Sequence, residues 1–354
     1  MAEEKSAKGE GRGCHKNLRN FPLNFQGDIC EEDRPPNRYP KTFFLLPLSF
    51  FLVLKLTSLI LRLRFQRPTS LPYWMGSAFR GGFGIHLRKI VCYRPMHECE
   101  DCKFRENCLF YAAYENPYAK KGKSPPPRPI IFIPPFFGEP MDFKEGAEIE
   151  VKLLLLGEYS RYLPHVLLSL RQFGSYGLGD RRHIGLNKFE VAEAKCAFSG
   201  ETVYEEGAIY PSRLKEIDVK KLQPFEGRRV RVNFYTPIQL PLGFPPPPQH
   251  LLKLIHQRLV RFVNEYGSGE KVGDFMCEGK VKPVMQRYHR LVGVSQRTGK
   301  REFWHCWTGI ADYEFEKLDE TGRWLLGVGK VLGAGAKSSF GMGFLNFEPI
   351  DFSL

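Results

Sequence analysis

The sequence lacks both a secretion signal and an uninterrupted apolar segment of membrane-spanning length. The opening stretch MAEEKSAKGEGRGCHKNLRN is polar and has no apolar core of the kind that a signal peptide requires. The most apolar stretch, residues 43–63, is interrupted by Pro47, and it contains Lys55 and Arg62, each of which is costly in lipid. Its second half, LKLTSLILRLRF, alternates with period two apart from one slip at Leu59-Ile60, which predicts a half-buried strand with a bulge. We therefore expect a cytoplasmic protein without a membrane partner.

The sequence also lacks the two common glycine-rich motifs that bind nucleotides. The segment GVGKVLGAGAKSSFGMGF, residues 327–344, contains six glycines, but Ala336 rather than a glycine precedes Lys337. A P-loop also needs a helix after its lysine, whereas SFGMGFLNFEPIDF alternates as a strand does. A dinucleotide-binding fingerprint fails because its third glycine is missing. Glycines this dense indicate positive φ angles or another molecule lying against the main chain.

The nine cysteines, which occur without a secretion signal, argue against a disulfide framework. Four of them follow the spacing C-x6-C-x2-C-x5-C, namely Cys92, Cys99, Cys102 and Cys108. Four thiolates can close a tetrahedral shell, so the spacing predicts one structural zinc ion that staples a segment of low apolar content. His97 is a candidate to replace one thiol. An iron–sulfur cluster and four reduced thiols are the alternatives.

Positive charge is abundant. Lysine and arginine number 52 against 39 aspartates and glutamates, which gives a formal charge of +13. Such a balance favours a polyanionic partner, nucleic acid first, although a basic protein can carry its charge without a specific partner. A length of 354 residues is enough for two domains with their own cores.

The pattern of strands and helices occurs twice along the chain. Each half is predicted to run strand, helix, strand, strand, helix, glycine loop, strand, which is the ferredoxin-like order of an α+β fold. The second half includes a hairpin that is predicted to turn at Thr298-Gly299. We predict a flexible arm over residues 1–45, a ferredoxin-like domain over 46–225 with a cysteine-containing insertion at 92–127, and a second such domain over 226–354.

The element order, GSAFRGGFG, the cysteine segment CEDCKFRENCLFY and the terminal GAGAKSSFGMGF together resemble the RAMP proteins of CRISPR systems. More narrowly, residues 45–352 resemble the pre-crRNA-processing endoribonucleases, the sixth Cas family, in a branch with a four-cysteine cluster. The resemblance implies cleavage of repeat RNA without a catalytic metal, which gives guide RNA with 2′,3′-cyclic phosphate ends. Its implied partners are CRISPR repeat RNA, guide RNA and subunits of an effector complex. The alternatives are a non-catalytic RAMP subunit that binds guide RNA and a zinc-stabilised RNA-binding module unrelated to CRISPR.

Cleavage of RNA without a metal needs a base for the 2′-hydroxyl proton and an acid for the leaving 5′-oxygen, and histidine suits both roles. The resemblance places the family's usual histidine on or near the first helix, and His86 is the histidine that fits. It lies at the edge of the apolar stripe of this helix, which also suits a core histidine. Lys89, one turn away, is the second catalytic candidate. His165 and His183 are the competing histidines.

The resemblance also implies that the glycine loop lets backbone amides approach RNA phosphates and that an arginine on the first helix binds RNA. The predicted RNA-binding residues are Arg80, Arg181, Arg182, His183, Gly333, Gly335, Lys337, Ser338, Gly341 and Gly343. A tight corner that locks the last helix to the sheet is the alternative role for the loop, and a surface salt bridge is the alternative for the arginine. Tyr288, Phe303 and Trp304 can stack bases, although strand aromatics are more often part of a core.

Overall fold

The structure, a computed structural model, describes residues 53–94, 98–118, 125–179, 185–268, 272–294 and 301–350. The predicted N-terminal arm, His97, residues 181–183 and the predicted turn at Thr298-Gly299 lie outside the described residues. Residues 46–354 form one structural unit. Among its described helices, none is long and apolar enough to cross a membrane.

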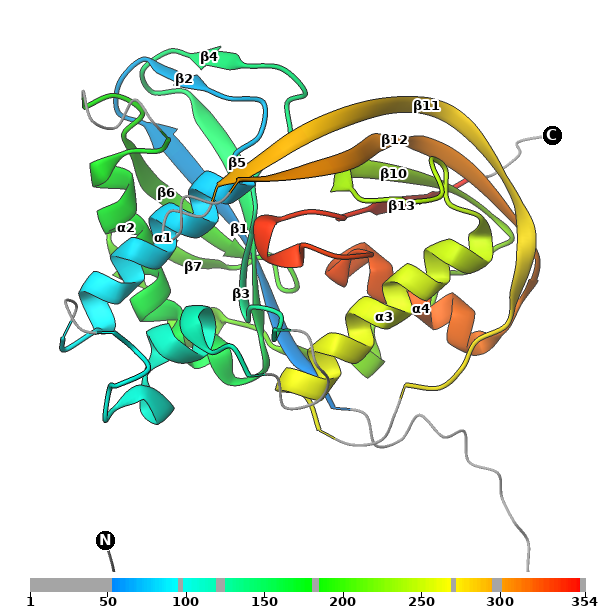
Figure 1. The fold of residues 1–354 in the computed structure, drawn as a ribbon, viewed down its shortest axis with the longest axis horizontal. Helices are drawn as coiled ribbons and strands as arrows, with labels where there is room; N and C mark the ends of the chain where they lie inside the picture. The colour runs from blue at the N-terminus through cyan, green and yellow to red at the C-terminus, as the bar shows by residue number, and fades with distance from the viewer. Residues whose placement is uncertain are drawn as a thin grey trace, which may run out of the picture. The chain divides into compact units, whose positions relative to one another are not determined.

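The first half of this unit is an antiparallel sheet with two helices (Figure 1). Its main elements are β1 (Lys55–Phe65), α1 (Gly76–Val91), β3 (Ile130–Ile133), β5 (Glu148–Leu156), α2 (Leu163–Tyr176) and β6 (Phe189–Cys196). The strand order is β3-β5-β1-β6, which is the ferredoxin-like order. Short strands are β2 (Thr69–Leu71) paired with β4 (Met141–Phe143), β7 (Thr202–Glu205) and β8 (Ala208–Ile209) beyond β6, and β9 (Ile217–Asp218) beside β1. The short helical segments are η1 (Arg105–Asn107), the π-helical η2 (Tyr111–Glu115), η3 (Gly157–Tyr162), η5 (Pro211–Arg213) and η6 (Val219–Lys221).

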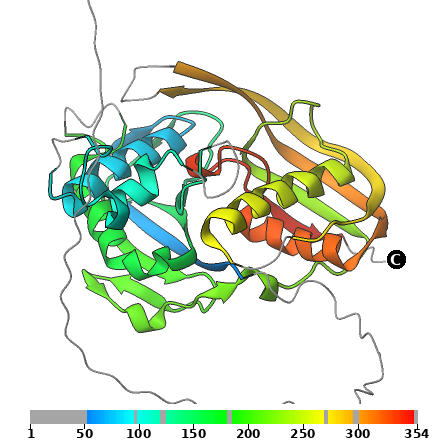
Figure 2. The same cartoon turned by 60° about the horizontal axis from the view of Figure 1, so that its bottom comes forward.

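The second half repeats the same plan. Its elements are β10 (Arg229–Ile238), α3 (Pro248–Tyr266), β11 (Cys277–Val294), β12 (Arg301–Leu318), α4 (Glu320–Leu332), the turn η7 (Ser338–Phe340) and β13 (Asn346–Pro349). The strand order β11-β12-β10-β13 matches that of the first half, and α3 and α4 lie side by side (Figure 2). The predicted tandem ferredoxin-like α+β fold is therefore confirmed. In Figure 1, β11 and β12 form a long curved hairpin that extends past β10 and β13.

Strand β1 contributes to two hydrophobic cores, which explains its departure from simple alternation. Leu54 and Leu56 pack with the core of the second half, whereas Leu59 and Leu61 pack with α1 and α2. The leucines therefore change from one core to the other at Thr57-Ser58. The sequence placed this slip in the alternation at Leu59-Ile60. The register shift also lies elsewhere, where the pairing of β1 with β6 changes between Arg62 and Leu63.

Candidate functional site

The glycine-rich loop after α4 is held in place by one buried arginine from α3. The Arg258 side chain is 3% exposed, and its guanidinium donates hydrogen bonds to four loop carbonyls. The acceptors, with their distances, are Leu332 (3.0 Å), Gly335 (2.8 Å), Ala336 (3.1 Å) and Met342 (2.8 Å). Burial lowers the pKa of Arg258 to about 9. The loop therefore has a defined shape that the protein itself maintains.

Four glycines of this loop adopt positive φ angles, as their density indicated. They are Gly333, Gly335, Gly341 and Gly343, with φ of 72°, 73°, 72° and 75°. Their amides donate to the carbonyls of Gly329, Leu254, Ser338 and Pro237, respectively. These four amides are engaged within the protein in this conformation, and their contact with RNA phosphates stays a prediction. The geometry matches the alternative role, a tight corner between the last helix and the sheet.

Two polar side chains of the loop, Lys337 and Ser338, lie in different surroundings. Lys337, with φ of 60°, donates to Glu302 Oε2 at 2.9 Å, and its Nζ lies 4.9 Å from the Trp304 ring centre. This contact joins the loop to strand β12. Ser338 is buried within η7. An RNA phosphate that pairs with Lys337 would compete with Glu302.

Helix α1 meets the loop at its first two turns. A Cβ on Gly76 would lie 2.0 Å from the Phe340 carbonyl oxygen, so glycine permits this close approach. One turn later, the Arg80 guanidinium lies 4.4 Å from the centre of the Phe340 ring. The motif GSAFRGGFG thus contains the residues that join α1 to the loop, although the two segments are far apart in the sequence.

Three donors around this junction have no acceptor among the described residues. They are the indole Nε1 of Trp74, the hydroxyl of Ser77 and Nε of Arg80, all buried. Trp74 packs in a small cluster that includes Met342 and Phe340, and Ser77 lies one turn before Arg80. A buried donor without an acceptor costs about 1–3 kcal/mol. Because each atom is enclosed by protein in this conformation, an oxygen acceptor of a ligand reaches it only if the junction opens.

A second half-buried arginine, Arg128, which the sequence did not reveal, accompanies Arg80. Burial lowers the pKa of both Arg80 and Arg128, and the charge of Arg80 lowers the pKa of Arg128 further. Arg128 donates to the Asn116 carbonyl at 3.2 Å. Tyr114 lies close to both cations, since each of them influences its pKa. The Glu115 carboxylate raises the pKa of both arginines, so an acid of the protein already offsets part of their positive charge.

His86 lies within the packed contact between α1 and α2. Its side chain is 4% exposed, its Nδ1 is 3.3 Å from Gln172 Oε1, and its ring centre is 5.9 Å from that of Phe173. Burial lowers the pKa of His86, and the charge of Lys89 acts in the same direction. Lys89 is exposed, with Nζ 5.6 Å from the Tyr176 ring centre. This placement suits a core histidine, and the catalytic role of both residues stays a prediction.

The predicted metal ligands lie in one region after α1. Cys92, Cys102 and Cys108 line a cavity of about 350 Å³ together with His165, which is exposed on α2. Burial raises the pKa of the Cys99 thiol, and the neighbouring Cys108 and Cys92 thiols act in the same direction. However, among the described residues no three cysteine, histidine or acidic side chains are close enough to hold a metal ion. The donor set fits zinc in chemistry but not in geometry, so zinc binding stays a prediction.

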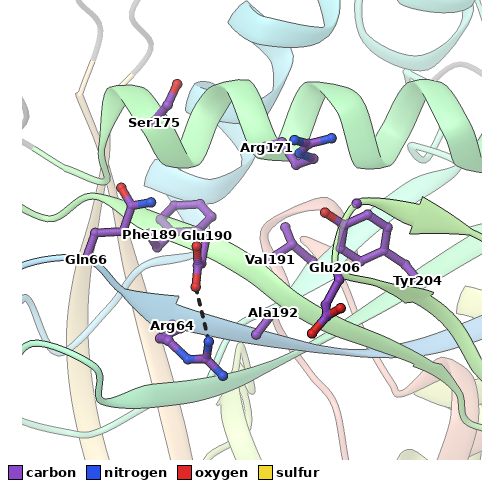
Figure 3. A pocket seen from close by; sticks show the side chains of 11 residues that line it. Arg64, Gln66, Arg171, Ser175, Phe189, Glu190, Val191, Ala192, Tyr204 and Glu206 are labelled. Atoms are coloured by element: carbon purple, nitrogen blue, oxygen red, sulfur yellow. Dashed lines mark hydrogen bonds and ion pairs between the residues drawn. The ribbon is translucent and has the colours of Figure 1, made fainter.

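A larger cavity, of about 420 Å³, lies beside α2 and β6 (Figure 3). Arg64 and Arg171 contribute its positive charge. Arg64 pairs with Glu148 at 2.8 Å and with Glu190 at 3.3 Å, which offsets its charge. This cavity shares no residue with the glycine loop or with the predicted catalytic residues.

Family comparisons match both halves of the chain. The N-terminal domain described as AF_1859_N matches residues 54–217, and the C-terminal domain AF_1859_C matches residues 230–347. An uncharacterized protein of Archaeoglobus fulgidus is 38% identical over 298 residues, which cover 83% of this chain and 98% of that protein.

Solved structures with a similar arrangement include two Cas6 proteins. Thermus thermophilus Cas6 (TTHB231) matches with a TM-score of 0.44 and 14% sequence identity. The match covers 83% of this chain and 99% of the Cas6 chain. The Cas6 (TTHA0078) product complex has a TM-score of 0.39 and 19% identity, and covers 83% of this chain and 100% of its own.

Proposed function

The chain belongs to the AF_1859 family, and we propose that it is an endoribonuclease that cleaves CRISPR precursor RNA within its repeats. The reaction needs no catalytic metal. A base removes the 2′-hydroxyl proton, the 2′-oxygen attacks the adjacent phosphorus, and the bond to the 5′-oxygen breaks. An acid protonates that oxygen, which leaves a 2′,3′-cyclic phosphate on the upstream product. The sequence resemblance supports this choice of reaction.

The observation that carries the proposal is the junction of α1 with the glycine loop. It combines two half-buried cations, Arg80 and Arg128, with three enclosed donors that lack acceptors, one of which is Nε of Arg80 itself. Phosphate oxygens are acceptors, and each phosphate carries the negative charge that two guanidiniums favour. Because the glycine amides are engaged internally, side-chain donors rather than loop amides supply the contacts to RNA in this account.

The burial of His86 favours a second candidate function. A general base must come within hydrogen-bonding distance of the proton it removes, and a ring that is 4% exposed does not reach a substrate in this conformation. The alternative is a non-catalytic RAMP subunit that binds guide RNA through the same junction. A catalytic role for His86 therefore requires that α1 and α2 separate enough to expose its ring.

Incubation of the purified chain with labelled repeat RNA in EDTA tests the proposal. Cutting at one position in EDTA supports the enzyme. Tight binding without cutting supports the RAMP subunit, and the absence of any RNA binding contradicts both functions. The Arg80→Ala variant tests whether RNA binds at the junction. Its affinity for the RNA should fall while the chain remains folded. Arg171→Ala, an exposed arginine of α2, is the matched control for lost charge.

A further inference from the structure

The distal half of the β11–β12 hairpin, residues 286–293 and 301–308, carries a row of aromatic and cationic side chains on one face. The facing pairs along this row are Tyr288 with Trp307, Arg290 with His305, and Val292 with Phe303. Tyr288 and Phe303 are each 50% exposed, and Val292 is 39% exposed. Large apolar side chains that are exposed together on a strand face indicate a binding surface rather than a core.

The side chains of this row contact one another in sequence. The Arg290 guanidinium lies 4.4 Å from the Phe303 ring centre. The His305 and Tyr288 rings stack with centres 5.9 Å apart, and the Tyr288 hydroxyl is hydrogen-bonded to His305 Nδ1. Tyr288 then meets the Trp307 ring edge to face, at 5.3 Å. These contacts fix the ring orientations before any ligand arrives, which lowers the entropy cost of binding.

The opposite face of the same hairpin segment is already occupied. Leu291, Trp304 and Cys306 are buried there against Trp74 and Met342, beside the glycine loop. His289 on that face contacts Phe136, with ring centres 4.8 Å apart. The inner face of the hairpin thus packs against the junction that we propose binds RNA. The outer row lies on the other face of the same two strands.

Charge along the hairpin is divided between its two halves. The proximal half pairs its charges, as in Lys280 with Glu316 at 2.8 Å and Lys317 with Glu278 at 2.7 Å. The distal half contains three arginines, two histidines and a single acid, Glu302, which is bonded to Lys337 and Trp304. An exposed aromatic row with an excess of positive charge complements a polyanion that carries flat apolar groups.

We propose that the outer row of Tyr288, Arg290, Phe303 and His305 is a stacking platform for unpaired bases of the RNA. This inference rests on the proposed RNA substrate and specifies which part of it binds here: a single-stranded segment, not a duplex. Residues that share one face of a strand are about 6.8 Å apart, so the platform holds bases that are separated from one another. Aromatic rings stack any base, so the platform adds affinity with little sequence preference.

The test compares the full chain with a Tyr288→Ala, Phe303→Ala double variant. Anisotropy is measured with a labelled ten-nucleotide RNA and with the same strand in which abasic sugars replace the bases. The platform predicts about tenfold weaker binding of the intact RNA by the double variant, and no difference with the abasic strand. Tyr288→Phe with Phe303→Tyr should restore the affinity. Circular dichroism confirms that each variant is folded.

Tyr210→Ala is the matched control, because Tyr210 is 36% exposed and lies 4.2 Å from the Arg213 guanidinium, on the other half. The inference is overturned if the double variant binds the intact RNA as tightly as the unaltered chain does. It is also overturned if sedimentation shows that the unaltered chain dimerises, the double variant is monomeric, and RNA affinity is unchanged. Absence of RNA binding by the unaltered chain contradicts instead the proposed function on which the platform rests.

Discussion

The guanidinium of Arg80 stacks on the ring of Phe340, 4.4 Å from its centre, and so joins helix α1 of the first half to the glycine-rich loop of the second. The contact brings three enclosed donors without acceptors to one place, one of which is Nε of the Arg80 cation itself. It is the structural basis for assigning RNA binding to this junction.

Replacing Arg80 should weaken RNA binding more than replacing an arginine elsewhere. Arg80→Ala should cost about tenfold in affinity, the scale of one charge-assisted hydrogen bond. It should also reduce the slope of log K against log salt by about one if it removes one phosphate contact. Filter binding at several salt concentrations measures both quantities. Equal losses in Arg80→Ala and Arg171→Ala would mean that the effect is one of overall charge.

Two glycines of the loop should respond differently to the addition of one methyl group. A Cβ at Gly343 would lie 2.1 Å from the Ala334 carbonyl oxygen and 2.7 Å from Arg258 Nη2, whereas at Gly335 the nearest atom is 3.7 Å away. Gly343→Ala combines steric overlap with an unfavourable φ and should lower the free energy of unfolding by about 3 kcal/mol. Gly335→Ala faces the φ cost alone, about 1 kcal/mol. Urea unfolding measures both values, and similar losses would contradict the described loop conformation.

The four-cysteine segment should contain about one zinc ion per chain. Elemental analysis after gentle purification measures it. Cys99→Ser should then lower the melting temperature without moving the cleavage site, because structural zinc stabilises the fold around it. Iron in the purified chain, together with visible colour, would indicate an iron–sulfur cluster instead of zinc. A chain that contains no metal, and whose melting temperature is the same in Cys99→Ser, would indicate four reduced thiols.

Burial of His86 should make stability fall as the solution becomes acidic. Its pKa is lowered in the folded chain, so below about pH 6.5 the unfolded chain takes up a proton that the folded chain does not. The free energy of unfolding should therefore decrease as the pH falls through this range, by up to about 1.4 kcal/mol per pH unit for this residue. His86→Gln should reduce that slope, and His289, whose pKa is also lowered by burial, accounts for part of the remainder. An unchanged slope in His86→Gln would mean that the ring is accessible to protons in the folded state.

Sequence reasoning predicted the tandem fold because the pattern within each long helix and strand is local and occurs in the same order twice. It misplaced the slip in β1 because that strand passes from one core to another, which depends on partners far away in the chain. The sequence did contain an indication of the role of Arg258. This arginine lies three residues after Ile255 and one before Leu259, and therefore on the apolar face of α3, where both neighbours are buried. The burial of His86 depends on Gln172 and Phe173, which no local pattern links to it.

In the proposed reaction the RNA supplies its own nucleophile, and a substrate that lacks this nucleophile tests the reaction. The substrate is repeat RNA with a single 2′-deoxy sugar immediately upstream of the cut, incubated with the unaltered chain in EDTA. The account predicts that this RNA binds as tightly as the all-ribose strand and resists cleavage, while the all-ribose strand yields a 2′,3′-cyclic phosphate. His86→Ala should bind the ribose strand and cleave it about 10²-fold more slowly. Full activity of that variant would remove His86 from the mechanism, and cleavage of the deoxy substrate would contradict the mechanism itself.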